Sequence, residues 1–406
     1  MNKQIQRQSK NSRKLVKRFH LLPAGIIVAV IILVVVVSTN RYTNKTVSVV
    51  FYNIPDTIQY ELELRIKKLK SSGITFSTWP AEEKLTKQIS KKYGLFFVWK
   101  GALADQFAEE AISPDTKLYH ALPPSIARAG LYDGQQKMIP LLMDNYEIAF
   151  YRTYRNAAGL QIPETLNSFE DYLRTVKKHA EIPLVCAGSN DRTLLGFVSA
   201  LTESVCGSEG YAALVGNVRE TPSVDNVADA TLSGSVSFRM VLDKIRSWQQ
   251  EKLLMPQWYK LKEKDIDMYM KNHLTAAVFM PLSTHRTKQF VLIKYYDAAR
   301  FPIDKTIANH AIVAPVIEGI MFRNKAGEQD ILEQLLSADN QTQLSTKTML
   351  APVASRAAAS DRQSDDVRYW AASCSDGPVA GLYDDAFTDD ATAAEFAAQI
   401  RDYVKK

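Results

Sequence analysis

Carboxylates, histidines and thiols are the side chains that could support catalysis, and their spacing decides which reactions are open. Asp56 follows a predicted strand and Asp144 lies in another, so the two acids could face each other across a cleft as glycoside hydrolysis requires. The six histidines, at positions 20, 120, 179, 273, 285 and 310, form no H-E-x-x-H motif. Neither G-x-S-x-G nor G-x-G-x-x-G occurs. Glycoside hydrolysis by this carboxylate pair is therefore the one enzymatic hypothesis that stays open. The prediction is that the protein is not an enzyme.

The cysteines, Cys186, Cys206 and Cys374, match no metal-binding spacing. Cys186 and Cys206 could form a disulfide if the strand and helix that they occupy are adjacent, or both could be small buried thiols. The sequence predicts neither a metal site nor a cofactor.

Polar and aromatic side chains stand where the first predicted strands end. The strand in "KTVSVVFYNIP" is followed by Asn53 and Asp56, and the strand in "KKYGLFFVWKG" ends at Trp99 and Lys100. The alternation of strand, helix and strand predicts a parallel α/β sheet, in which ligands bind outside the carboxyl ends of the strands. Both loops are therefore expected on one rim. The alternatives are that Trp99 covers the core and that Lys100 is a solvated charge.

The segment "IPLLMDNYEIAFYRTYRNAAGLQIPETLNSFEDYL" has the order expected of a connection between two packed bodies. An apolar strand over residues 139–151 carries Asp144 and Asn145, and a helix follows after Gly159 and Pro163. Asn167 is the predicted cap of that helix, from Ser168. The strand is predicted to cross from one lobe to the other.

Asp144 is the strongest single candidate for a ligand contact. A carboxylate on a nearly buried strand costs several kcal/mol unless it is paired or belongs to a ligand site. The alternative is a structural ion pair with Arg152 or Arg155.

Length and charge limit the classes of protein. A chain of 406 residues exceeds the size at which one hydrophobic core usually stops growing, so two lobes are expected. The formal net charge is +6, but residues 1–20 contribute +7, which leaves −1 for all the others. A basic surface for nucleic acid is therefore not supported.

Residues 21–38, "LLPAGIIVAVIILVVVVS", contain no charge over 18 positions. That length suffices for a transmembrane helix, and the basic arm at 1–20 should stay cytoplasmic, which places residues 42–406 outside. A cleavable signal is the alternative, since Val36 and Ser38 are acceptable small residues before a cut.

Four segments, in the same order, resemble the extracellular solute-binding proteins of bacterial ABC importers, in the group of maltose- and oligosaccharide-binding proteins (family 1). They are "GLYDGQQKMIPLLMDNYEIAFYRTYRNAAGLQIPETLNSFEDYLRTVKK", "MVLDKIRSWQQEKLLMPQ", "DMYMKNHLTAAVFMPLST" and "AGEQDILEQLLSADNQTQLSTKTMLAPVASRAA". The resemblance spans residues 45 to about 400. The sequence departs from the family pattern at Leu282, Ser283 and Thr284, where an aromatic residue is usual, and at His273, where glycine is usual.

The resemblance implies an α/β, two-lobed periplasmic-binding-protein (type II) fold with a three-segment hinge, preceded by one N-terminal transmembrane helix. The expected division is a basic arm at 1–20, an anchor or uncleaved signal at 21–38, a first lobe at 45–144 with roughly 280–316, and a second lobe at 145–279 with roughly 317–406.

Ligand-binding residues follow from the same resemblance, position by position. The implied set is Asn53, Asp56, Trp99, Lys100, Asp144, Asn145, Asn190, Asp191, Arg192, Trp258, Tyr259 and Ser283. Some of these residues could instead have local structural roles. Asn190 to Arg192 could form a turn with a helix cap, and Trp258 could close a helix end.

The function implied by the resemblance is capture of a small solute, a sugar or oligosaccharide, between lobes that close on a hinge. The expected partners are ABC permease subunits and the membrane, because the chain has no G-x-x-x-x-G-K-[ST] motif of its own. The expected location is the bacterial inner (cytoplasmic) membrane, single-pass, with an extracytoplasmic (periplasmic) body. The alternatives are a surface glycan-binding or sensor module without transport and a glycosidase.

Overall fold

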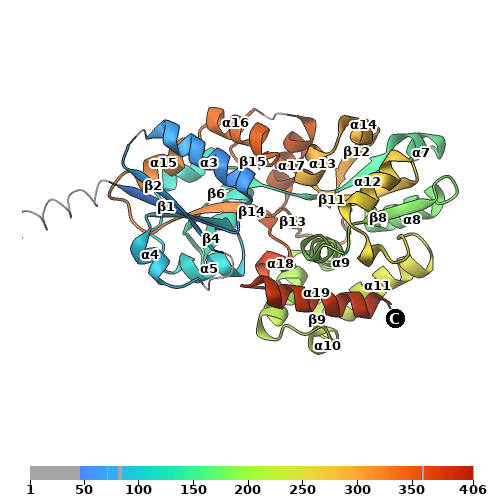
Figure 1. Cartoon of the computed structure of the whole chain (residues 1–406). Helices are drawn as coiled ribbons and strands as arrows, with labels where there is room; N and C mark the ends of the chain where they lie inside the picture. Colours follow the sequence, from blue (N-terminus) through green and yellow to red (C-terminus); the bar gives the residue numbers. More distant parts are fainter. Residues whose placement is uncertain (1–45, 71, 81–84, 359–360, 406) are drawn as a thin grey trace, which may run out of the picture.

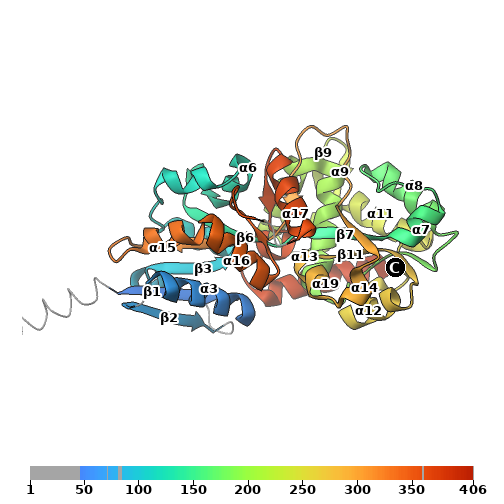
Figure 2. The same cartoon turned by 90° about the horizontal axis from the view of Figure 1, so that it is seen from above.

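The structure, a computed structural model, describes residues 46–70, 72–80, 85–358 and 361–405. Within these residues the chain forms two lobes that lie side by side, each built on its own sheet and flanked by helices (Figures 1 and 2). The predicted α/β class is confirmed. The predicted cytoplasmic arm at 1–20 and membrane segment at 21–38 lie outside the described residues.

The sheet of the first lobe has, within the described residues, six strands in the order β15-β6-β14-β3-β1-β2. β1 pairs in parallel with β2 and β3, whereas β14 is antiparallel to β3 and β6. The strands are β1 (Val47–Tyr52), β2 (Ile74–Trp79), β3 (Leu95–Trp99), β6 (Met138–Met143), β14 (Val316–Met321) and β15 (Ala351–Pro352), with a small hairpin of β4 (Leu131–Tyr132) and β5 (Gln135–Gln136).

Helices cover this sheet because their apolar residues recur at helical spacing. Ile58, Leu62 and Ile66 of α3 lie four residues apart and are buried in the same core as Phe51 of β1 and Leu332 of α15. The helices of the first lobe are α3 (Asp56–Leu69), α4 (Gln88–Lys92), α5 (Ala102–Ala108), η1 (Thr116–Ala121), α6 (Pro124–Ala127), η2 (Arg128–Gly130), α15 (Glu328–Leu335), α16 (Ala338–Thr348) and α17 (Arg362–Ser373).

The second lobe is built on a sheet of four strands, counted within the described residues, in the order β12-β7-β11-β8. β11 is parallel to β8 and antiparallel to β7. The strands are β7 (Tyr146–Tyr151), β8 (Ile182–Cys186), β11 (Thr275–Pro281) and β12 (Tyr296–Arg300), with a small pair of β9 (Thr231–Ser233) and β10 (Val236–Ser237).

The long helix α9 lies at the centre of the second lobe, with Phe197 buried in its core. Gly207 interrupts α9 with a φ of 71°. Residues that carry a side chain rarely adopt this backbone conformation. The other helices of the lobe are α7 (Arg152–Ala157), α8 (Leu166–Val176), α10 (Val224–Val227), α11 (Phe238–Gln250), η3 (Trp258–Lys260), α12 (Glu263–Lys271), α13 (Leu282–Thr287), α14 (Phe290–Ile293), α18 (Leu382–Asp385) and α19 (Asp390–Lys405), besides α9 (Asp191–Glu220).

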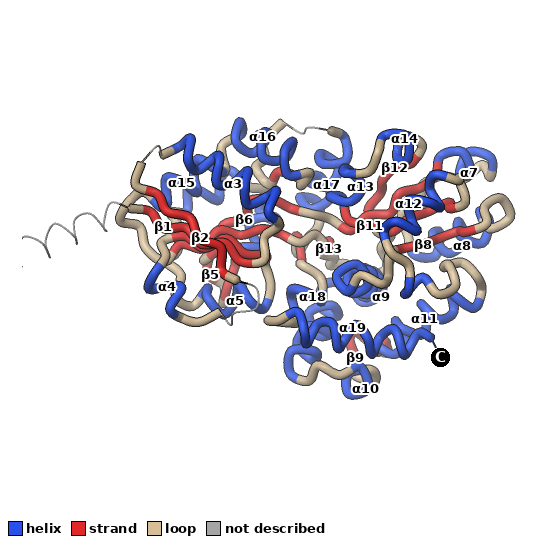
Figure 3. The backbone as a smooth tube through the Cα atoms, in the orientation of Figure 1, coloured by secondary structure: helices blue, strands red, loops and turns tan. Residues whose placement is uncertain are grey.

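The chain passes between the lobes three times within the described residues. It crosses from β6 to β7 at Asp144 and Asn145, from β12 to β14 through β13 (Ile312–Val313), and from α17 to α18 through β16 (Pro378–Val379). β13 and β16 pair in parallel, so the second and third crossings lie side by side. Figure 3 traces these connections through the middle of the molecule.

The predicted later boundaries of the lobes are wrong. At residues 280–284 the chain only touches the first lobe: Leu282 is buried in its core and its N–H donates to Asn145 O at 2.8 Å. It then returns, because β12 pairs with β7 in the second sheet. β14 belongs to the first sheet, and α15, α16 and α17 bury residues in the first core, so much of 317–406 lies in the first lobe.

Across the described part of the chain, no helix is both long and apolar enough to cross a membrane. All three cysteines fall within that part, and they are buried, unpaired thiols. Burial raises the pKa of each thiol, so the buried-thiol alternative describes Cys186 and Cys206 in this structure.

Candidate functional site

The carboxyl ends of β1 and β3 lie together at the edge of the first lobe that faces the second. Asn53, directly after β1, adopts the left-handed conformation at φ 51°. The indole Nε1–H of Trp99, at the end of β3, donates to the backbone oxygen of Asn53 at 3.0 Å. The structure therefore brings together the two loops that the sequence placed on one rim.

Gly101 brings the second lobe into contact with this rim. Its φ of 138° is rare for residues with a side chain, and a Cβ there would lie 2.1 Å from the backbone oxygen of Asp384. Asp384 belongs to α18, which packs on the second lobe through the buried Leu382. The lobes thus touch, backbone to backbone, at the end of β3.

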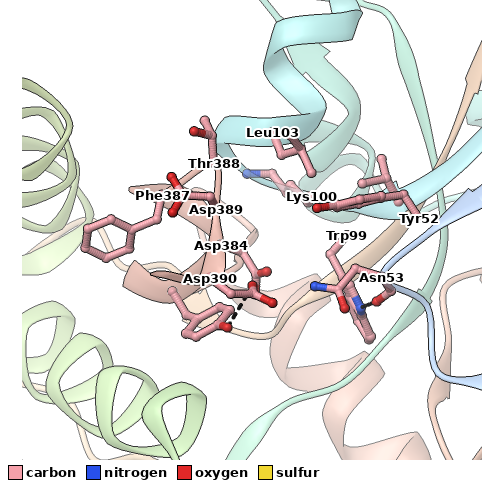
Figure 4. A pocket seen from close by; sticks show the side chains of 12 residues that line it. Tyr52, Asn53, Trp99, Lys100, Leu103, Asp384, Phe387, Thr388, Asp389 and Asp390 are labelled. Atoms are coloured by element: carbon pink, nitrogen blue, oxygen red, sulfur yellow. Dashed lines mark hydrogen bonds between the residues drawn. The ribbon is translucent and has the colours of Figure 1, made fainter. Parts of the chain in front are cut away.

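A narrow hollow of about 30 Å³ lies between the rim and α18 (Figure 4). In Figure 4, Tyr52, Asn53 and Trp99 stand on one side and Asp384, Asp389 and Asp390 on the other. Larger hollows of about 500 and 480 Å³ adjoin it, since they share lining residues such as Lys100 and Phe387. We call the three together the interlobe cleft. The first hollow is lined by Tyr52, Asn53, Val98, Trp99, Lys100, Leu103, Tyr383, Asp384, Phe387, Thr388, Asp389 and Asp390.

Arg192, at the start of α9, pairs with Asp384 in the cleft. Its guanidinium carbon lies 4.2 Å from the ring centroid of Tyr383 and 5.9 Å from that of Trp99. Burial raises the pKa of Asp384 to about 6, and the opposing effect of Arg192 only limits this rise.

Further ion pairs connect the lobes. Lys100 Nζ lies 3.8 Å from Asp385 Oδ1, and Arg219 of α9 lies 2.9 Å from Asp105 of α5. Asp385 is held in place because its Oδ2 accepts hydrogen bonds from the Tyr211 hydroxyl and from the backbone N–H groups of 380 and 381. The cleft thus has a rigid, charged floor.

Asp144 and Ser283 meet where the chain crosses between the lobes. The carboxylate of Asp144 accepts from the backbone N–H of Asn145 at 2.9 Å, and from the N–H of Ser283 at 3.0 Å and its hydroxyl. Burial raises the pKa of Asp144, and the hydrogen bonds from Ser283 oppose that rise. The side chain of Asn145 is fully buried, and neither of its polar atoms has a hydrogen-bond partner among the described residues.

The alternative ion pair of Asp144 is wrong, because Arg152 and Arg155 both pair with Asp297, at 2.6 and 2.9 Å. The structure also does not bring the predicted acid pair, Asp56 and Asp144, together in the cleft. Asp56 is exposed in the first turn of α3 and does not line it, and Asp144 is engaged by Ser283.

Other predicted ligand residues have structural roles in the second lobe. Asn190 caps α9, with its side chain accepting from the N–H of Thr193 at 2.9 Å, and Asp191 pairs with Arg401 at 2.6 Å. Trp258 is fully buried and donates to Gln249 at 3.0 Å, so it has no exposed ring face for stacking. Tyr259, its neighbour in η3, is only 9% exposed.

Sequence reasoning missed the lobe-two wall of the cleft. Tyr383, Asp384, Asp385, Asp389 and Asp390 come from "GLYDDAFTDD", a segment that received no interpretation. Four aspartates close to Tyr383 and a phenylalanine were the available signal. Within the described residues, no group of three or more His, Cys, Asp or Glu side chains could hold a metal ion.

Comparison with solved structures identifies the fold of this chain, whereas comparison of its sequence identifies no family. No family model matches the chain, and no curated protein matches it. Among solved structures, the bacterial solute receptor AcbH aligns with a TM-score of 0.71 at 13% identity, over 89% of this chain and 98% of that one. The putative binding protein MsmE of Bacillus subtilis, in an open conformation, gives 0.68 at 13% identity, over 89% and 93%. RafE of Streptococcus pneumoniae gives 0.65 at 10% identity, over 89% and 98%.

These neighbours are binding proteins, and the alignments cover both lobes. The chain therefore has the fold of the bacterial solute-binding proteins, as the resemblance implied.

Proposed function

We propose that this chain is the membrane-tethered, extracytoplasmic substrate-binding component of an ABC importer, and that it captures a sugar or oligosaccharide by hinge closure. The observation that carries the proposal is the interlobe cleft, where the rings of Tyr52, Trp99 and Tyr383 stand among carboxylates. Proteins hold sugars with aromatic faces against C–H patches and with charged groups that bind neighbouring hydroxyls.

The structural neighbours support a carbohydrate ligand. AcbH is described as having an exclusive preference for β-D-galactopyranose, RafE has been solved with raffinose, and a further neighbour is a chitin oligosaccharide binding protein. The hinge would be the three crossings, because they are what connects the lobes covalently.

A thermal-shift titration tests the binding step. A fragment from Arg41 to Lys406 is titrated with monosaccharides and oligosaccharides, and a ligand at ~100 Kd should add about 2.7 kcal/mol to the free energy of unfolding. Trp99→Ala should lose the shift, because it removes a ring face from the cleft. Tyr369→Ala should keep it, because Tyr369 is exposed on α17 and does not line the cleft. A folded fragment that responds to no saccharide would overturn the proposal.

The tether is tested separately by fractionating cells that make the full chain. An anchored protein stays in the membrane pellet after an alkaline wash, whereas the Arg41–Lys406 fragment is released. A soluble product whose mass is that of a chain starting after Ser38 would support the cleaved-signal alternative instead. Loss of uptake of the identified ligand on deletion of the gene would separate import from a glycan-binding or sensor role.

A further inference from the structure

We propose that the saccharide bound in the interlobe cleft carries a protonated amino group. This inference rests on the proposed function and concerns the charge of the cleft. Of the described residues that line its three hollows, two are cationic and seven are acidic. The cations are Lys100 and Arg219, and the acids are Asp105, Glu209, Asp376, Asp384, Asp385, Asp389 and Asp390.

Four of these acids are neutralised by the protein. The ion pairs are Asp105 with Arg219, Asp376 with Arg128, Asp384 with Arg192, and Asp385 with Lys100. Glu209, Asp389 and Asp390 form no ion pair with any described residue. The cleft therefore has an excess of negative charge, although the sequence after residue 20 is nearly neutral as a whole.

Asp389 and Asp390 are fixed at the aromatic end of the cleft. Asp389 Oδ1 accepts from the N–H of Thr392 at 2.8 Å, and Asp390 Oδ1 accepts from the Tyr383 hydroxyl at 2.8 Å. Their negative charge acts on Tyr52 of the first lobe. Burial is the main cause of the raised pKa of Tyr52, and the charges of Asp390 and Asp389 raise it further. Both aspartates are exposed, so a ligand can reach them.

Lys100 does not offset this charge. Asp385 pairs with it at 3.8 Å, and burial raises the pKa of the nearby Glu318 of β14 well above its usual range, which favours the neutral acid at that position. Glu318 is fully buried, and neither of its carboxyl oxygens has a hydrogen-bond partner among the described residues. An anionic sugar would therefore meet repulsion at Asp389 and Asp390 without a free cation to compensate.

The protein already binds one cation beside the cleft in the manner required. Arg192 lies over the ring of Tyr383 and pairs with Asp384. An ammonium group between Asp389, Asp390 and the ring of Tyr52 would meet the same combination of a carboxylate and an aromatic face. The groups that such cation binding needs, aromatic rings and carboxylates, are thus present among the residues that line the two walls of the cleft.

The test compares sugars that differ only in an amino group. The full chain, purified in a polyoxyethylene detergent whose headgroup contains no sugar, is titrated by calorimetry with glucosamine and glucose, galactosamine and galactose, and chitosan trimer and cellotriose. We expect at least one amino sugar to bind tenfold or more tightly than its hydroxyl partner, with an affinity that falls as salt is added.

The double variant Asp389→Asn with Asp390→Asn should bring this ratio towards one. Asparagine keeps the side-chain oxygen that accepts from Thr392 and Tyr383, so the change removes charge and retains the helix cap. Asp402→Asn, an exposed position on the same helix, should keep the ratio. Equal or tighter binding of the hydroxyl partners would overturn the inference and leave the proposed function standing. Binding of no saccharide would overturn both.

Discussion

At the level of single residues, Arg192 connects the charged and aromatic parts of the cleft. It belongs to the second lobe, yet its guanidinium contacts the ring of Trp99 from the first lobe as well as Tyr383 and Asp384. An ion pair that is largely buried gains attraction but loses hydration, so the protonation of Asp384 depends on how far the lobes enclose it.

Asp384 should make stability depend on pH. Its pKa is raised by burial from 3.8 to about 6, so the folded state holds a proton that the unfolded chain releases between these values. The raised pKa stabilises the folded state fully below pH 3.8, and this stabilisation is lost as the pH rises through 6. The free energy of unfolding should fall by about 3 kcal/mol over these two pH units. Chemical unfolding of wild type and Asp384→Asn between pH 3.5 and 7 measures it as a difference of free energies. Asp402→Asn is the control, and parallel curves for wild type and Asp384→Asn would contradict the assignment.

Asp144 and Ser283 should be energetically coupled. Two of the hydrogen bonds that Asp144 accepts come from Ser283, and bonds to charged groups contribute about 1.5–3 kcal/mol. In a double-mutant cycle of Asp144→Ala and Ser283→Ala, we expect a coupling of about 1–2 kcal/mol in the free energy of unfolding. The backbone N–H of Ser283 remains in the alanine variant, which limits the coupling to the hydroxyl. Additive losses would show that the contact does not stabilise the crossing.

At the level of elements, the helix after the first crossing shows where sequence patterns stop being exact. Asn167 was predicted as the cap of α8, but the helix begins at Leu166 and Thr165 is its cap. Thr165 and Ser168 form a capping box, with Thr165 Oγ1 accepting from the Ser168 N–H at 3.2 Å. The apolar periodicity was read correctly, because Phe169, Leu173 and their neighbours are buried, whereas the start depends on one local conformation.

The cap gives a direct test on α8. Thr165→Ala should lower the free energy of unfolding by about 1 kcal/mol, because an N–H of the first turn loses its acceptor. Asn167→Ala, inside the first turn, should change it by less than about 0.5 kcal/mol. Urea unfolding of both variants distinguishes the two caps, and a larger loss in Asn167→Ala would restore the sequence-based assignment.

The sequence pattern of strands and helices predicted the places of elements that are neighbours along the chain. It did not predict the places of elements that meet through contacts between residues far apart in the sequence. The strand ends at Asn53 and Trp99 follow from local strand–helix alternation. Trp258 looked available, but a Cβ on Gly188 would lie 2.4 Å from its ring, a close approach that only the fold creates. The position of Asp384 depends on the pairing of β13 with β16, strands far apart in the chain, which the sequence does not reveal.

At the level of the whole molecule, three crossings and a set of direct contacts decide how the lobes sit. The crossings at 144–145, β13 and β16 keep the lobes together, while the contact of Gly101 with Asp384 brings their facing edges into touch. Ion pairs such as Asp105 with Arg219 are partly exposed and contribute about 0–1 kcal/mol each. Steric fit at Gly101 should therefore control closure more strongly than these charges.

Gly101→Ala should hold the lobes apart. The added methyl group would overlap the backbone oxygen of Asp384, and neither backbone can move aside as a flexible side chain would. We expect a larger radius of gyration by solution X-ray scattering and at least tenfold weaker saccharide binding. Gly134→Ala is the matched control, because Gly134 also has a positive φ, of 69°, but an added Cβ meets nothing within 4 Å. Both variants should be strained and somewhat less stable, and only Gly101→Ala should expand. Equal radii and equal affinities in the two variants would show that the end of β3 does not govern how the lobes meet.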